Sequence, residues 1–257
     1  MKTQLLSILT LLTLCLSINA QNVNIPDANF KRSLLKDHNI DSNRDNEISI
    51  AEASAYTGRI LVYNKSVSSL SGIEAFVNIT ELNVPLNNFT SIDISKNTAL
   101  TKLDFSNNNL TTIDVSNNIA LTFLQGSYNN LTSIDVSKNT SLANLNLIQN
   151  NLTSLDVSEN TALTFLSCGY NSLTSLDVSK NTSLTYLSCN KTDLTSLDVS
   201  GNPVLAQLNC TRSSELTNLN IANGNNTNIG NAAFQATNNP KLTCITVDNV
   251  TWSDSNW

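Results

Sequence analysis

Apolar and polar residues alternate along most of this chain in a pattern that repeats every 21 residues. The first half of each repeat reads LxxLxLxxNxL and the second half reads LxxLDVSxN. Six gapless repeats begin at Ile79, Leu100, Leu121, Leu142, Leu163 and Leu184. A fixed period of this length predicts a solenoid, because a single unit cannot bury its apolar face without neighbours stacked on it.

Each repeat is predicted to form two short extended arms. Apolar residues occur at every second position around Leu103 and Phe105, and again around Ile113 and Val115. This alternation is typical of a strand with one buried face. Residues 57–78 resemble a variant unit of 22 residues, and 205–225 a unit with one insertion. Residues 226–240 form an Asn-rich excursion, and residues 242–245 are expected to form a last repeat strand.

Polar residues recur at three positions of the repeat. Two Asn columns mark the predicted corners, where Asn side chains satisfy backbone groups that tight turns leave unpaired. They are Asn87, Asn108, Asn129, Asn150 and Asn171, and Asn97, Asn118, Asn139, Asn160, Asn181 and Asn202. An Asp column on the second arm runs through Asp93, Asp114, Asp135, Asp156, Asp177 and Asp198. We expect hydrogen bonds from Ser and turn amides, rather than bound cations, to compensate this charge.

Over residues 57 to 247, this repeat pattern resembles the leucine-rich repeat family, in particular its 21-residue class with nested halves found in secreted bacterial proteins. The resemblance implies a leucine-rich repeat solenoid, an arc or horseshoe. Short parallel strands would line its concave face, extended segments its convex face, and a small helical cap its N-terminal end. The expected organisation is a signal peptide (1–20), a helical EF-hand-like cap (21–56), leucine-rich repeats (57–225) and an irregular C-terminal cap with a last repeat strand (226–257).

The first 20 residues carry the features of a secretory signal. Lys2 precedes an apolar run from Leu5 to Leu16, and small residues lead to a cleavage position after Ala20. The run is shorter than the roughly 20 apolar residues that a transmembrane helix needs. Cys15 would suggest a lipid anchor, but Leu14 stands where a small residue is wanted. We expect an exported protein that is secreted, periplasmic or held at the cell surface.

The net charge limits the classes of partner, and the positions of the cysteines bear on whether disulfides form. The chain has 14 basic and 20 acidic side chains, which argues against nucleic acid and against insertion into, or binding to, an anionic membrane. Cys168, Cys189 and Cys210 share one repeat position that Phe105, Leu147 and Ile221 fill elsewhere, so burial as small apolar residues is expected rather than disulfides. We expect a monomer.

Residues 41–52, DSNRDNEISIAE, carry the ligand spacing of an EF-hand loop. The predicted calcium ligands are Asp41, Asn43, Asp45, Glu47 through its carbonyl, Ser49 and Glu52. Asn46 stands at the position usually held by Gly, and Asn tolerates the positive φ needed there. Helices are expected at 26–39 and 50–56. The alternative needs no ion, because residues 49–52 also read as a capping box.

Aromatic residues gather at outward positions of the central repeats. Phe123, Phe165 and Tyr186 precede the second Leu of the first arm, and Tyr128 and Tyr170 follow that Leu by four residues. With the polar residues Gln125, Asn144 and Asn190, they form the predicted ligand-binding band, suited to a sugar ring or a protein loop. The alternative is that they are ordinary strand residues facing solvent.

The sequence predicts binding rather than catalysis. His38 is its one histidine, and no Ser/His/Asp set, acid pair or phosphate-binding loop is visible. We expect no enzyme activity and no cofactor besides one calcium ion. The expected function is recognition of a protein or glycan through the concave face. The alternatives are a spacer without a ligand and an inhibitor or accessory module of an extracellular hydrolase.

Overall fold

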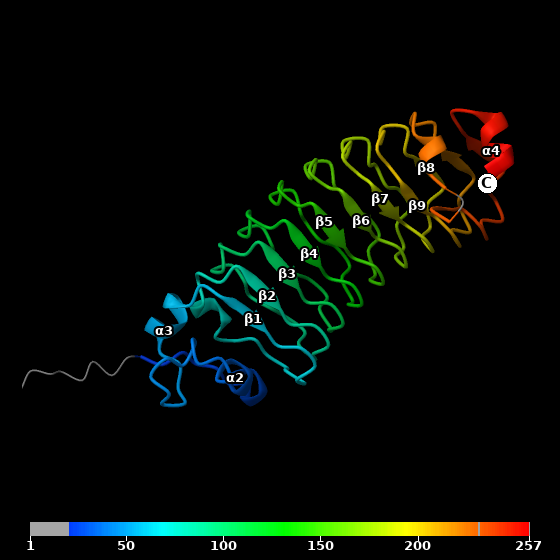
Figure 1. Cartoon of the computed structure of the whole chain (residues 1–257). Coiled ribbons are helices and arrows are strands. Elements are labelled where there is room, and N and C mark those ends of the chain that lie inside the picture. Colours follow the sequence, from blue (N-terminus) through cyan, green and yellow to red (C-terminus); the bar gives the residue numbers. More distant parts are fainter. Residues whose placement is uncertain (1–20, 231, 257) are drawn as a thin grey trace, which may run out of the picture.

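A computed structural model describes residues 21–230 and 232–256. The predicted signal peptide therefore lies outside the described residues. Figure 1 shows a row of stacked coils with helices at both ends. Among the described residues, no helix is long and apolar enough to cross a membrane.

The main element is a parallel sheet of nine short strands, one from each successive coil. Its order is β1 (Arg59–Leu61), β2 (Glu81–Asn83), β3 (Lys102–Asp104), β4 (Phe123–Gln125), β5 (Asn144–Asn146), β6 (Phe165–Ser167), β7 (Tyr186–Ser188), β9 (Gln207–Asn209) and β11 (Phe234–Gln235). Leu82, Leu103 and Leu124 lie opposite one another in register. The predicted solenoid of parallel strands stacked at a 21-residue period is confirmed.

The second arm forms a sheet only near the C-terminal end, with the order β12 (Cys244–Thr246), β10 (Asn218–Asn220) and β8 (Ser196–Asp198). The strand predicted at 242–245 exists, but it extends this second sheet. The last strand of the main sheet, β11, lies instead inside the Asn-rich segment that was predicted to be an excursion. Phe234 pairs with Leu208 and Ile245 pairs with Leu219, so the insertion lengthens one whole coil before both arms resume.

Short helices complete the coils and close the ends. The 3-10 turns η1 (Ile73–Ala75) and η2 (Asn226–Asn228) lie within coils. Helix α2 (Ala28–Leu34) begins at the N-cap Asp27 and is shorter than predicted, because Leu35 caps it and turns follow. Helix α3 (Ile50–Ala55) confirms the second predicted helix, and Ser49 and Glu52 form the capping box. Helix α4 (Val250–Asn256) lies at the opposite end of the chain.

One continuous apolar core runs from the cap through all coils. Cys168, Cys189 and Cys210 are free and buried in it, as predicted. Burial raises the pKa of the Cys168 thiol to about 12, so the thiol stays neutral at physiological pH. The assignment of Ile221 to this column was wrong, because Ile221 follows β10 and donates its backbone N–H to Thr246 in the second arm.

The two Asn columns are structural ladders, as predicted. Asn139 Nδ2 donates to the carbonyls of Val115 (3.0 Å) and Asn118 (2.9 Å), which joins its corner to the preceding coil. In the other column, Asn129 Oδ1 accepts the amide of Leu110 at 3.0 Å. The buried Oδ1 atoms of one column have no partner among the described residues: Asn97, Asn118, Asn139, Asn160, Asn181 and Asn202. Each of these six side chains therefore acts as a donor only.

The exposed Asp column is compensated as expected. Asp93 Oδ1 accepts the amide of Ser95 at 2.9 Å, and the same bond recurs in the following coils. Hydrogen bonds from the side chain and the backbone of Ser95 lower the pKa of Asp93. These local bonds stabilise the ionised carboxylates at every turn.

Candidate binding face

The outward side chains of the main sheet form a surface that we call the sheet face. In β4 and β5 the middle residue is buried in the core and the first and third residues are half-buried on the outward side. In β6 and β7 the first residue is half-buried and the third, a serine, is buried. Successive coils thus contribute neighbouring side chains, spaced by about 4.8 Å between strands. Residues at the same position of successive repeats therefore form a row across the strands on this surface.

Phe165 and Tyr186 form a stacked pair on the sheet face. Their ring centroids are 4.4 Å apart and their planes differ by 5°. The centroid separation is close to the strand spacing, so the rings stand side by side along the row and each covers one face of the other. The two ring faces that meet are therefore closed to a ligand, and the outer faces lie toward Asn144 and Gln207 of the neighbouring strands. Phe123 belongs to the same row, but Asn144 separates it from Phe165.

Tyr128 and Tyr170 do not lie on the strands with this pair. Both occupy the turn that follows the strand, with φ of 55° and 54°. The prediction that all five aromatics project from one face was wrong, because these two positions need a left-handed backbone and so lie at the corner. Tyr128 is 47% exposed, and the Lys191 ammonium lies 4.9 Å from the ring centroid of Tyr170.

The predicted polar residues differ in their availability. Gln125 and Asn144 are half-buried on the sheet face, and Gln125 Nε2 donates to Ser127 Oγ at 3.2 Å. Asn190 is only 8% exposed, and its Oδ1 accepts from Ser188 Oγ at 3.0 Å. Its place in the predicted band was wrong, since it packs against Gly169 inside the corner.

The structure adds charged residues that the predicted band did not contain. A hollow of about 220 Å³ lies beside Phe123 and is lined by Glu81, Lys102 and Asp104. A second one, of about 480 Å³, surrounds Tyr170 at the corner and includes Lys191 and Arg212. The sequence could have indicated this cationic hollow. In two successive repeats the ladder Asn is replaced by Thr192 and Ser213, and the residue just before it is Lys191 and Arg212.

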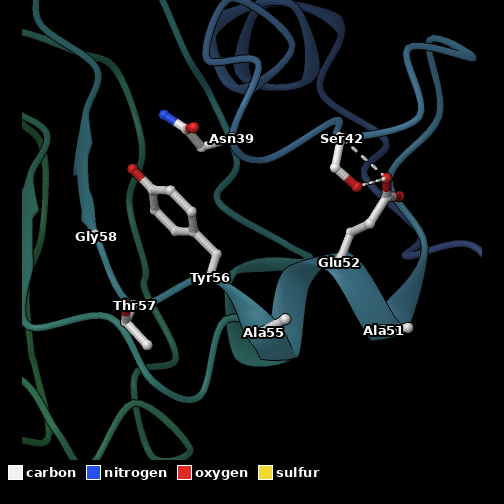
Figure 2. Close-up of a pocket in the computed structure, with 8 residues that line it drawn as sticks. All are labelled: Asn39, Ser42, Ala51, Glu52, Ala55, Tyr56, Thr57 and Gly58. Atoms are coloured by element: carbon white, nitrogen blue, oxygen red, sulfur yellow. Dashed lines mark hydrogen bonds between the residues drawn. The ribbon is translucent and has the colours of Figure 1, made fainter.

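The 41–52 loop of the cap is held by its own hydrogen bonds. Asn46 has φ of 65°, which confirms the left-handed turn expected at this position. Asp41 accepts the amides of Asp45 and Asn46, both at 3.2 Å. Glu52 Oε1 accepts the amide of Ser42 at 3.0 Å and its hydroxyl at 2.8 Å (Figure 2).

Glu52 is the last of the six predicted calcium ligands, and both its oxygens are engaged. Oε2 accepts the amide and the hydroxyl of Ser49, at 3.0 and 2.9 Å. Burial opposes ionisation, but these bonds and those from Ser42 outweigh it and lower the pKa of Glu52 to about 2. The Glu47 side chain pairs with Lys31 at 2.6 Å. Within residues 21–230 and 232–256, no group of three or more His, Cys, Asp or Glu side chains is placed to hold a metal ion.

Two cavities border the cap. One, of about 620 Å³, is lined by the residues drawn in Figure 2, where the Tyr56 ring and the Glu52 side chain extend to the same side of helix α3. The other, of about 530 Å³, lies between α2 and β1. Tyr56 links both, since its hydroxyl donates to Asp37 at 2.9 Å or to the Arg59 carbonyl at 3.0 Å.

No protein-family model and no curated protein matches this sequence. Solved structures do match. Internalin C2 from Listeria monocytogenes is 18% identical over 88% of this chain and 96% of that chain, with a TM-score of 0.57. A leucine-rich repeat protein of Leptospira interrogans is 22% identical over 66% of this chain and 50% of that one, also with a TM-score of 0.57.

The functional domain of InlJ from Listeria monocytogenes, which includes a cysteine ladder, is also similar. It is 28% identical over 87% of this chain, with a TM-score of 0.48. The chain spans 63% of the InlJ domain and half of the Leptospira protein. Together with the observed coils, the likeness to internalin C2 and to the Leptospira protein shows a leucine-rich repeat solenoid.

Proposed function

We propose that this protein is an exported binding protein that holds a partner protein on its sheet face. The stacked pair of Phe165 and Tyr186 is the observation that carries this proposal. Two large apolar rings on an outward row offer contact area that loses little conformational entropy on binding, as expected of an interface anchor. A stacked-repeat fold supports the proposal because it presents an extended surface for recognition.

The geometry of the pair favours a protein over a glycan. Stacking on a sugar requires an open ring face, whereas one face of each ring is covered by the other ring at 4.4 Å and the second face lies toward Asn144 or Gln207 in the next strand. Ring edges and the half-buried polar side chains Gln125 and Asn144 suit a partner with its own apolar side chains and backbone groups. A glycan ligand and a spacer without a ligand are the outcomes that would replace this proposal.

The test compares two double variants on arrays of purified extracellular proteins and of glycans. Phe165→Ala with Tyr186→Ala removes the pair, and Ile119→Ala with Val204→Ala removes two exposed apolar side chains away from the sheet face. We expect a protein ligand whose affinity falls at least tenfold in the first variant and less than twofold in the control. Equal binding by both variants, binding to glycans alone, or binding to neither array would overturn the proposal.

Calcium binding by the cap is a separate proposal. The left-handed Asn46 and the carboxylate of Asp41 support it, but Glu52 would have to release its bonds to Ser42 to reach an ion. We expect calcium to raise the melting temperature of residues 21–257, and Asp41→Asn to remove this shift. An unchanged melting temperature and no heat in a calcium titration would leave the capping box as the loop's sole function.

Export and oligomeric state are open to direct measurement. We infer that cleavage after Ala20 releases a chain that begins at Gln21. N-terminal sequencing of the protein recovered from the cell envelope or the medium tests this inference. We also propose that the exported chain is a monomer, and sedimentation of residues 21–257 would reveal a dimer.

A further inference from the structure

The groove between helix α2 and strand β1 lies beside a free sheet edge. Its floor contains core residues of both elements, including Leu34 and Ile60. Among the strands that the structure describes, β1 pairs with β2 alone, so its other edge faces the cap. Figure 1 shows the cap helices beside β1 at the N-terminal end of the solenoid.

Backbone groups of β1 alternate between its two edges. Val62 donates its amide to Asn83 at 2.8 Å and Asn64 donates to Pro85 at 3.1 Å, so the even-numbered residues point toward β2. The N–H and C=O of Leu61 therefore point toward the groove. Within the described part of the chain, the Arg59 carbonyl lies 3.0 Å from the Tyr56 hydroxyl, which donates to it or to Asp37, and Leu61 has no such partner at this edge.

Side chains around this edge are unusually exposed and basic. Leu61 is 51% exposed and Tyr63 is 59% exposed, whereas the outward residues of β4 and β5 are half-buried. Lys36, Arg59 and Lys65 line the groove, and none of them forms an ion pair with any described residue.

The groove contains one acidic side chain, Asp37, which accepts the amide of Asn39 and lies 2.9 Å from the Tyr56 hydroxyl. Glu81 lies opposite Arg59 in register, on the β2 side of β1 and away from the groove. The free edge therefore has an excess of positive charge in a chain whose net charge is −6. This local charge is complementary to an acidic partner.

We propose that β1 receives an extended acidic segment of a partner protein as an additional strand. The backbone of the segment pairs with Leu61, as in recognition by strand addition. Its carboxylates face Lys36 and Lys65, and its apolar side chains cover Leu61 and Tyr63. This site is distinct from the Phe165–Tyr186 pair.

The test uses a labelled peptide, acetyl-(Glu-Val)3-amide, and its basic counterpart, acetyl-(Lys-Val)3-amide, in fluorescence anisotropy with residues 21–257. Leu61→Pro removes the outward N–H without breaking a bond to β2, and proline is tolerated on edge strands. Leu61→Ala keeps the amide and is the matched control. We expect the acidic peptide to bind, and Leu61→Pro to weaken it at least tenfold while Leu61→Ala weakens it less than threefold.

Charge reversal provides a second readout should Leu61→Pro fail to fold. Lys36→Glu with Lys65→Glu is expected to reverse the preference between the two peptides. Hydrogen exchange should show new protection of the Leu61 amide when the acidic peptide binds. The proposal is wrong if the acidic peptide does not bind, if Leu61→Pro binds it as well as Leu61→Ala, if charge reversal leaves the preference unchanged, or if Phe165→Ala with Tyr186→Ala abolishes the binding. The last result would instead place the peptide on the sheet face.

Discussion

Gly126 makes room for the ring of Phe105, and this pair gives a sharp test of core packing. The position holds Phe105, Gly126, Leu147 and Cys168 in successive coils. A Cβ on Gly126 would lie 2.5 Å from Phe105 Cζ and 2.8 Å from Cε2, closer than real atoms approach. Both residues are buried, so Gly126→Ala forces the ring or the coil to move.

The expected magnitude follows from two opposing contributions. Overpacking a buried site costs about 1–3 kcal/mol, while replacing a glycine of negative φ by alanine recovers about 0.5–1 kcal/mol of conformational entropy. Gly126→Ala should therefore lower the free energy of unfolding by about 0.5–2 kcal/mol. Phe105→Leu alone should cost about 1 kcal/mol through lost burial. Together the two changes should be less harmful than their sum, because the new methyl group fills the space that the ring leaves.

Urea unfolding followed by circular dichroism measures all four members of this cycle. Gly230→Ala is the matched control, since a Cβ there meets nothing within 4 Å. We expect the control to be neutral or slightly stabilising and the cycle to show a favourable coupling of about 1 kcal/mol. Strict additivity, or a Gly126→Ala variant as stable as the control, would refute the steric explanation.

Three further predictions concern the ladder, the core thiols and the cap. Asn139→Ala should lower the free energy of unfolding by about 1–3 kcal/mol, because it removes two buried hydrogen bonds between coils. The two carbonyls would keep only their bonds to the amides of Asn118 and Leu121. The exposed Asn130→Ala should change the free energy of unfolding by less than about 0.5 kcal/mol in the same urea assay. A thiol reagent should modify the exposed Cys244 in the native protein but reach Cys168 only on unfolding. The pKa of Cys168 is raised to about 12 in the folded protein. Its neutral thiol therefore leaves the free energy of unfolding at its full value below the unfolded thiol pKa of about 8.5, and this stability is lost as pH rises toward 12. Melting curves across this pH range would detect the loss. The pKa of Glu52 is lowered to about 2 in the folded protein. The contribution of its carboxylate to the free energy of unfolding is therefore fully present above the unfolded pKa of about 4.3 and is lost as pH falls toward 2. Glu52→Gln should flatten this acid dependence of the melting temperature.

Most of the architecture could be predicted from residue order because every coil repeats the same local pattern. The spacing of Leu103 and Leu124 set the register, and the Asn and Asp columns set the hydrogen bonds of the corners. The C-terminal coil was not predicted, because residues 226–240 lack the repeat pattern. Only contact with β9 showed that Phe234 and Gln235 form a strand.

The candidate site was predicted less completely than the fold. The row of Phe165 and Tyr186 follows from the repeat period, but their ring orientation depends on side-chain packing between coils. Tyr170 was assigned to the wrong surface because its left-handed backbone is a property of the turn rather than of its residue type. The hollow around Tyr170 with Lys191, and the groove beside β1, each form where segments far apart in the sequence meet, so neither could be placed from the sequence alone.

The sequence by itself determined the solenoid, the residues of its core and the ladders at its corners, because these depend on periodicity and local hydrogen bonding. The tertiary structure decided which outward residues share a surface, which of them are buried, such as Asn190, and where a sheet edge stays open. Those properties depend on how neighbouring coils and the cap pack against one another. A single repeat carries no information about that packing.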